Sequence, residues 1–167
     1  MGRHVAVVWV LWAGVFDPAR GAEAQVLLGF VDSDRRFAVQ GAVDGAAARL
    51  SRRSCQDVLS DFADESGQSL QTRLLARRSS PSEAFAALRF VDSHIAPQCS
   101  GGTTLAFTHT GSAVIHVCGG QFRKRSMRNR MTAEIIVIHE FLHTLGLGEN
   151  PPTSEAITAQ VALRCGR

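Results

Sequence analysis

The segment Ile135–Glu149 reads IIVIHEFLHTLGLGE and is apolar except for a few polar side chains at helical spacing. At about 100° per residue, His139, Glu140 and His143 fall within one sector of a helix, and isoleucines and leucines occupy the opposite side. A buried polar group without a partner costs roughly 1–3 kcal/mol. The polar sector therefore requires a metal ion, a water-filled cleft or hydrogen-bond partners.

The spacing of His139 and His143 suits a metal ion, because side chains one helical turn apart can direct two imidazole nitrogens at the same point. Zn²⁺ is the ion that we expect. Glu140 would lie beside the metal, where a carboxylate can take a proton from an activated water and later deliver it to a leaving amine. The alternative is an ordinary buried helix whose two histidines donate hydrogen bonds to backbone carbonyls.

The sequence His139-Glu-Phe-Leu-His143 resembles the His-Glu-x-x-His zinc metallopeptidases, the zincins. Gly146 and Glu149 stand where the metzincin subgroup has its glycine and third ligand, but Glu149 replaces His or Asp and no methionine follows Met131. The tail after the motif is similar to that of small secreted bacterial zincin-like proteins. This resemblance implies an α+β fold with a mixed sheet, an active-site helix and a C-terminal helix.

Glu149 is the predicted third zinc ligand, with Glu155 or a water as the alternatives. Gly146 can adopt the positive φ that ends a helix and turns the chain back toward the metal. Glu155 lies near the start of the next helix, where an acidic side chain has the alternative role of complementing the helix N-terminus.

Residues 1–24 are typical of a secretory signal peptide. Met1–His4 is basic, Val5–Phe16 is an apolar run too short to span a bilayer, and Ala22-Glu-Ala24 resembles a cleavage site. One domain would then occupy residues 25–167, in a secreted or periplasmic protein. The sequence leaves two alternatives for residues 25 to about 42, a short propeptide or the start of the domain.

Four cysteines, Cys55, Cys99, Cys118 and Cys165, would mature in an oxidising compartment after export. Of the three possible pairings we favour Cys99–Cys118, which closes a hairpin-sized loop, together with Cys55–Cys165. A competing idea makes Cys55 a thiolate that caps the zinc.

The net charge of +3 indicates only a mild basic bias. Five basic residues lie in the segment Arg123–Arg130, where they would form a solvated surface or attract acidic substrates, anionic lipid or polyanions. The segment has no interleaved aromatic residues for base stacking, so we expect no nucleic-acid partner. We also expect a monomer, without stable membrane insertion, whose partner is a peptide or protein substrate.

Hydrophobic patterns predict helices over residues 43–63 and 81–88 and strands over residues 70–76, 89–92, 104–109 and 113–117. Ser80 and Ser154 are predicted N-caps. The strand 113–117 is a candidate edge strand for binding extended peptide, with a plain core strand as the alternative. His109 and His116 are candidates for polarising a scissile carbonyl, although single histidines on strands are more often structural.

Three functions follow from these patterns. The first is a secreted zinc-dependent endopeptidase with His139, His143 and Glu149 as ligands and Glu140 as general base. The second is a non-catalytic zinc-stabilised binding module, and the third is a cationic surface-binding protein that depends on segment 123–130.

Overall fold

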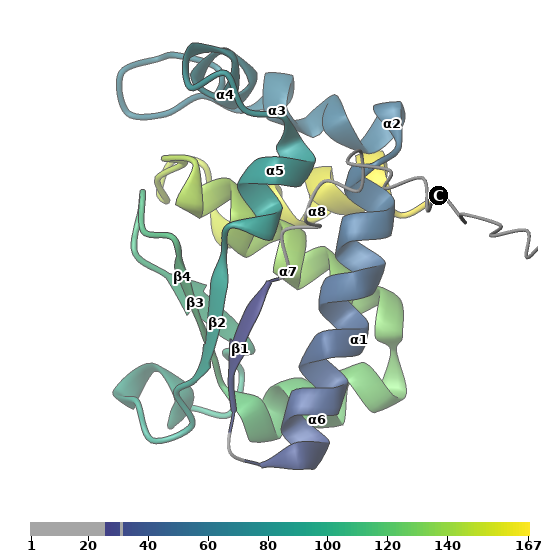
Figure 1. Cartoon of the computed structure of the whole chain (residues 1–167). Coiled ribbons are helices and arrows are strands. Elements are labelled where there is room, and N and C mark those ends of the chain that lie inside the picture. Colours follow the sequence, from purple (N-terminus) through teal and green to yellow (C-terminus); the bar gives the residue numbers. More distant parts are fainter. Residues whose placement is uncertain (1–25, 31) are drawn as a thin grey trace, which may run out of the picture.

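A four-stranded mixed sheet forms one side of the molecule in a computed structural model that describes residues 26–30 and 32–167. The strands are β1 (Leu27–Gly29), β2 (Arg89–Asp92), β3 (Ala106–Thr108) and β4 (Val114–Val117). Their order is β1-β2-β4-β3; β1, β2 and β4 are parallel, and β3 is antiparallel to β4 (Figure 1). The predicted α+β class with a mixed sheet is confirmed.

Three helices pack against one another on the core side of this sheet (Figure 1). They are α1 (Ser33–Leu50), α6 (Gly119–Arg128) and α7 (Arg130–Thr144), and α8 (Ser154–Cys165) packs against α7. Helix α7 is buried on nearly all sides from Ala133 onward, which agrees with its apolar sequence. The core therefore surrounds the helix that carries the histidines.

Helices α1 and α7 are joined by a buried ion pair at a glycine. Glu134 accepts hydrogen bonds from Arg49 Nε at 2.7 Å and Arg130 Nε at 3.0 Å. A Cβ on Gly45 would lie 2.3 Å from the Glu134 carboxylate, so the absence of a side chain permits the contact.

The first predicted helix begins earlier and ends earlier than the sequence suggested. Helix α1 starts at Ser33, after an N-cap in which Asp32 accepts a hydrogen bond from the Arg35 amide. The rest of the predicted 43–63 helix is divided into the short helices α2 (Arg53–Gln56) and α3 (Val58–Asp61). Residues 33–42 are part of α1, and α1 packs on α6 and α7, so this part of the chain belongs to the domain.

The predicted strand 70–76 is wrong, because Leu70–Ala76 is helix α4. Its residues are mostly good helix formers, and Ser69 caps it by accepting from the Thr72 amide at 3.1 Å. Helix α5 (Pro81–Ala86) follows with the predicted Ser80 cap, here a full capping box with Glu83. The predicted Ser154 cap is wrong by one residue, since Thr153 caps α8.

The β-hairpin of β3 and β4 is confirmed, but the prediction that residues 113–117 form the edge strand is wrong. Strand β4 lies between β2 and β3, and β3 is the edge. Alternation of hydrophobic residues shows that a segment is a strand, but it does not show which strands become its neighbours.

Both predicted disulfides are present, Cys55–Cys165 between α2 and α8 and Cys99–Cys118 between the 3-10 helix η1 (Pro97–Cys99) and the start of α6. The thiolate-cap idea for Cys55 is therefore wrong. In the chain-entropy view a loop the size of the shorter one contributes about 3 kcal/mol of stability, and a loop of about 100 residues about 4.7 kcal/mol. Among the described residues, no helix is both long enough and apolar enough to cross a membrane.

Core packing around α7 predicts a large difference between two phenylalanines. Phe141 is fully buried, with its ring 5.5 Å from that of Phe85, whereas Phe37 is 82% exposed. We expect Phe141→Ala to lower the free energy of unfolding by about 3–5 kcal/mol. Phe37→Ala should change it by about 0.5 kcal/mol or less. Urea denaturation measures both, and equal losses would contradict this packing.

Candidate metal centre

Helix α7 brings His139, Glu140 and His143 to one buried face. Their exposed fractions are 3%, 6% and 5%. Asn129 caps the helix by accepting a hydrogen bond from the Thr132 amide, and Thr144 is its last residue. The polar sector predicted from the sequence is thus inside the protein and not on its surface.

A glycine turn at the end of α7 directs the chain back over this face. The Gly146 amide donates to the His143 carbonyl at 3.0 Å and the Leu147 amide to the Leu142 carbonyl at 3.2 Å, which is a Schellman motif. Gly146 has φ +108°, and a Cβ there would lie 2.9 Å from Arg73 Nη1. Both the backbone conformation and the limited space at position 146 therefore favour glycine. Glu149 follows three residues after this turn.

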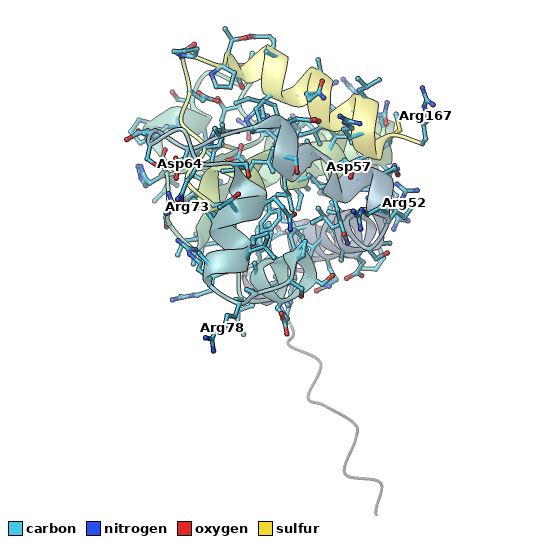
Figure 2. The ribbon with its side chains drawn as sticks, turned by 90° about the horizontal axis from the view of Figure 1, so that it is seen from above. Arg52, Asp57, Asp64, Arg73, Arg78 and Arg167 are labelled. Carbon is cyan, nitrogen blue, oxygen red and sulfur yellow. A yellow bond between two sulfur atoms is a disulfide. The ribbon has the colours of Figure 1, made fainter. Side chains whose placement is uncertain are left out.

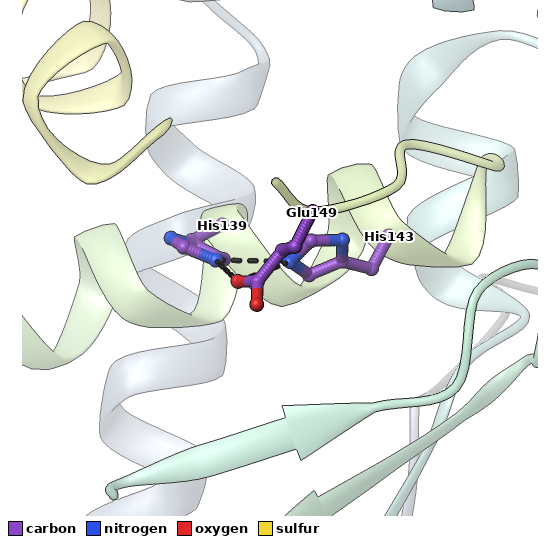
Figure 3. Close-up of side chains that lie close together, drawn as sticks. All are labelled: His139, His143 and Glu149. Atoms are coloured by element: carbon purple, nitrogen blue, oxygen red, sulfur yellow. Dashed lines mark hydrogen bonds and ion pairs between the residues drawn. The ribbon is translucent and has the colours of Figure 1, made fainter. Parts of the chain in front are cut away.

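Three potential ligand atoms converge at this point (Figure 3). Nε2 of His139 lies 3.0 Å from Nε2 of His143, and Oε1 of Glu149 lies 3.6 Å and 3.4 Å from those nitrogens. Ligand atoms bound at about 2.0–2.1 Å around a tetrahedral ion lie about 3.3 Å apart. The group has the donor atoms and the spacing to hold a metal ion.

Each histidine is oriented through its other ring nitrogen. His143 Nδ1 donates to the Leu147 carbonyl at 2.7 Å, and its other ring nitrogen, Nε2, faces His139. His139 Nδ1 lies 2.9 Å from the hydroxyl of Thr158 on α8. Metal-binding histidines are commonly held by such second hydrogen bonds. Burial, followed by the nearby His143, lowers the pKa of His139, which favours the neutral ring that binds metal.

Glu155, the alternative third ligand, is not part of this group. It is exposed in the first turn of α8, whereas Glu149 is half-exposed and directed at both histidines. Of the two glutamates, the geometry favours Glu149.

Glu140 is buried on the same face of α7 as the two histidines and has a carboxylate oxygen without a hydrogen-bond partner. Its Oε2 has no hydrogen-bond partner, and neither has the hydroxyl of Thr108 on β3. Burial raises the pKa of Glu140 to about 7, and the negative charge of Glu149 raises it further. The nearby Thr108 hydroxyl lowers this pKa, although the two groups form no well-aligned hydrogen bond. Two unpartnered polar groups side by side leave hydrogen-bonding capacity for a water or a bound molecule.

Strand β3 presents a free backbone edge next to Glu140. Phe107 lies opposite His116, and the Cys118 amide donates to the Leu105 carbonyl, so alternate residues of β3 bond to β4. The peptide groups of Ala106 and Thr108 point to the other side, where the sheet has no further strand among the described residues. The edge available to an extended peptide is β3, which precedes β4 in the chain and lies beyond it in the sheet.

The strand histidines do not join the centre. His116 alternates with the buried residues Ile115 and Val117, so its side chain is on the sheet face away from the core. There it lies 2.8 Å from the hydroxyl of Ser93 and stacks on Phe107, with the ring of His109 6.0 Å away. The predicted carbonyl-polarising role for His109 and His116 has no support from these positions.

A buried ion pair supports the turn at Gly146. Asp64 accepts from the Ser66 hydroxyl at 2.6 Å and from Arg73 Nη1 at 2.6 Å (Figure 2). The same Arg73 nitrogen lies against Gly146. The hydroxyl of Ser66 and then the Arg73 guanidinium lower the pKa of Asp64 to about 2.

Comparison of the chain with protein-family models, curated proteins and solved structures finds no match.

The ion pair beneath the turn predicts a pH-dependent stability effect. Because the pKa of Asp64 is depressed from 3.8 to about 2 in the folded protein, its ionised form stabilises the fold above pH 3.8, and this contribution is lost as the pH falls toward 2. Asp64→Asn keeps the side-chain shape but loses the charge. Its Tm should be below that of the wild type at pH 7, and the two should converge near pH 2.

Thermal scans from pH 7 to pH 2 measure this convergence. Asp44→Asn is the control, because Asp44 is exposed and forms no ion pair among the described residues, only a side-chain hydrogen bond with Gln40; it should change Tm little at any pH. A Tm difference for Asp64→Asn that stays constant down to pH 2 would contradict the assignment.

Proposed function

We propose that the protein is a metal-dependent peptidase in which His139, His143 and Glu149 hold Zn²⁺ and Glu140 is the general base. The observation that carries the proposal is the position of Glu140: a buried carboxylate with a free oxygen, adjacent to three metal-ligand atoms and to a free strand edge. A site that served folding alone would need the three ligands but not this carboxylate.

Two imidazoles and one carboxylate form the three-ligand set of many catalytic zinc sites, which keep one position open. A zinc ion bound there would polarise a water and the scissile carbonyl. Thr158 and the Leu147 carbonyl hold the two imidazoles in orientation, and the turn at Gly146 positions the carboxylate. Thus the protein itself fixes the geometry of all three ligands.

Glu140 would move the proton. Its carboxylate is buried in the same turn of α7 as the two histidines, so it is positioned to accept a proton from the attacking water and to donate it to the leaving amine. The peptide groups of Ala106 and Thr108 would bind the substrate main chain as an added strand. The Thr108 hydroxyl lies beside Glu140 and would hold a water or the substrate near it.

A non-catalytic zinc-stabilised binding module is the alternative. It gives no role to the free oxygen of Glu140, and an unpartnered buried polar group costs roughly 1–3 kcal/mol. A catalytic role for Glu140 would explain why the protein keeps a buried polar group at this cost.

We further propose that the protein is exported. Two disulfides are typical of chains that mature in an oxidising compartment. The predicted signal peptide, residues 1–24, lies outside the described residues and stays a prediction.

The two candidate third ligands can be separated by metal affinity. Glu149→Gln removes the charge and weakens the donor at the site, so Zn²⁺ affinity should fall by about tenfold or more. Glu155→Gln makes the same chemical change outside the site and should leave affinity unaltered. Competitive chelation measures both constants, and unchanged affinity in Glu149→Gln would refute the ligand assignment.

The role of Glu140 can be tested by an isosteric change. Glu140→Gln should bind one Zn²⁺ per chain and keep the fold, yet lose peptide hydrolysis by about 10²–10⁴-fold, because the proton carrier is gone. Cleavage of a broad peptide library, with and without a chelator, is the measurement. A metal-loaded wild type without chelator-sensitive cleavage would favour the binding module instead.

A further inference from the structure

A basic pocket of about 400 Å³ lies between helix α6 and the segment that leads into β3. The residues of its wall that matter here are Thr103, Leu105, Gln121, Lys124, Arg125 and Arg128. Among its lining residues there is no carboxylate. An anionic group entering this pocket would therefore meet three cations and no like charge.

The cations of this pocket are not used by the fold. Of the basic segment 123–130, Arg123 pairs with Asp34 at 3.3 Å and Arg130 with Glu134 at 3.0 Å. Lys124, Arg125 and Arg128 have no carboxylate within ion-pair distance among the described residues. The three unpaired cations are the ones that line the pocket.

The pocket is held in place by links between its two walls. The Cys99–Cys118 disulfide joins the η1 segment to the start of α6, and Gln121 Nε2 donates to the Cys99 carbonyl at 2.6 Å. The Cys118 amide also donates to the carbonyl of Leu105. These bonds fix α6 relative to the beginning of β3.

The pocket lies at the N-terminal end of β3, the edge strand. Leu105 lines the pocket and immediately precedes the strand, and Thr108, at the other end, adjoins Glu140. At about 3.3 Å per residue, these two residues are about 10 Å apart along the strand. An extended peptide on this edge with a reacting bond near Glu140 would bring a side chain three or four residues away to the pocket.

We propose that the pocket binds an acidic side chain of the peptide substrate, three or four residues from the scissile bond. This rests on the proposed peptidase function. Arg and Lys form strong charge-assisted hydrogen bonds to carboxylates, and the position of the pocket at the start of the edge strand favours a side chain of a bound peptide over a polymer or a membrane surface. Specificity for acidic peptides would then come from Lys124, Arg125 and Arg128.

Cleavage of matched peptides by the full, metal-loaded protein tests this proposal. Peptides carrying Asp or Glu at either side of the bond, three or four residues away, are compared with their Asn or Gln analogues. We expect kcat/KM to be about tenfold higher for the acidic peptide on one side, with the preference weakening at high salt. The side that shows the preference gives the direction of the bound peptide.

The variants are a triple change, Lys124→Gln, Arg125→Gln and Arg128→Gln, and the control Arg123→Gln on the same helix. The triple variant should lose the acidic preference while cleaving the neutral peptides as the wild type does. The control, which removes a charge that is paired with Asp34, should keep the preference. Preference that survives in the triple variant would overturn the proposal.

Binding measurements separate failure of this inference from failure of the peptidase proposal. In Glu140→Gln protein, fluorescence anisotropy compares an acidic peptide with its amide analogue, with and without the triple change. If the wild type cleaves nothing, binding of the acidic peptide that depends on the three cations still supports the pocket. If these cations affect only binding to heparin or to phosphatidylserine vesicles, the pocket serves a polyanion or a membrane and the inference is wrong.

Discussion

The structure depends on the burial of α7, a helix that is apolar on most of its surface and polar along one face. The apolar side packs against α1, α6, α8 and the sheet, but the polar side must find hydrogen-bond or ion-pair partners inside the protein. Thr158 and the Leu147 carbonyl provide them for the two histidines, and Arg49 and Arg130 provide them for Glu134. Among the buried carboxylates of the described residues, only that of Glu140 keeps a buried oxygen without a hydrogen-bond partner. The packing of the core and the chemistry of the centre are thus consequences of the same helix.

The parts of the centre that are close in sequence could be predicted from it. His139, Glu140 and His143 share one helical turn, and Gly146 signals the chain reversal that brings Glu149 to them. The pairing of the cysteines was also predicted, since a short loop and a long one were the favoured arrangement. Local rules suffice where the interacting residues are neighbours along the chain.

The remaining features depend on contacts between distant segments. Thr108 and Thr158 are ordinary threonines in the sequence, and only the packing of β3 and α8 against α7 gives them a role. Strand β3 is at the edge of the sheet. The alternation of hydrophobic residues is equally strong in β4, so this alternation could not show which of the two strands is the edge. The helix Leu70–Ala76 could not be predicted because seven residues are too few for a clear hydrophobic period, and the helix depends on its Ser69 cap and its neighbours. Helix α1 begins with a polar turn and an exposed Phe37, so its start gave little hydrophobic signal.

The carbonyl of His143 accepts hydrogen bonds from two amides, those of Gly146 and of Gly111 in the β3–β4 turn. One backbone atom therefore joins the ligand helix, the loop that carries Glu149 and the hairpin that carries the free edge. These two hydrogen bonds couple the positions of the three segments. Because both bonds join main-chain atoms only, side chains on the outer face of the hairpin can be exchanged without breaking the link between the strand edge and the three potential ligand atoms.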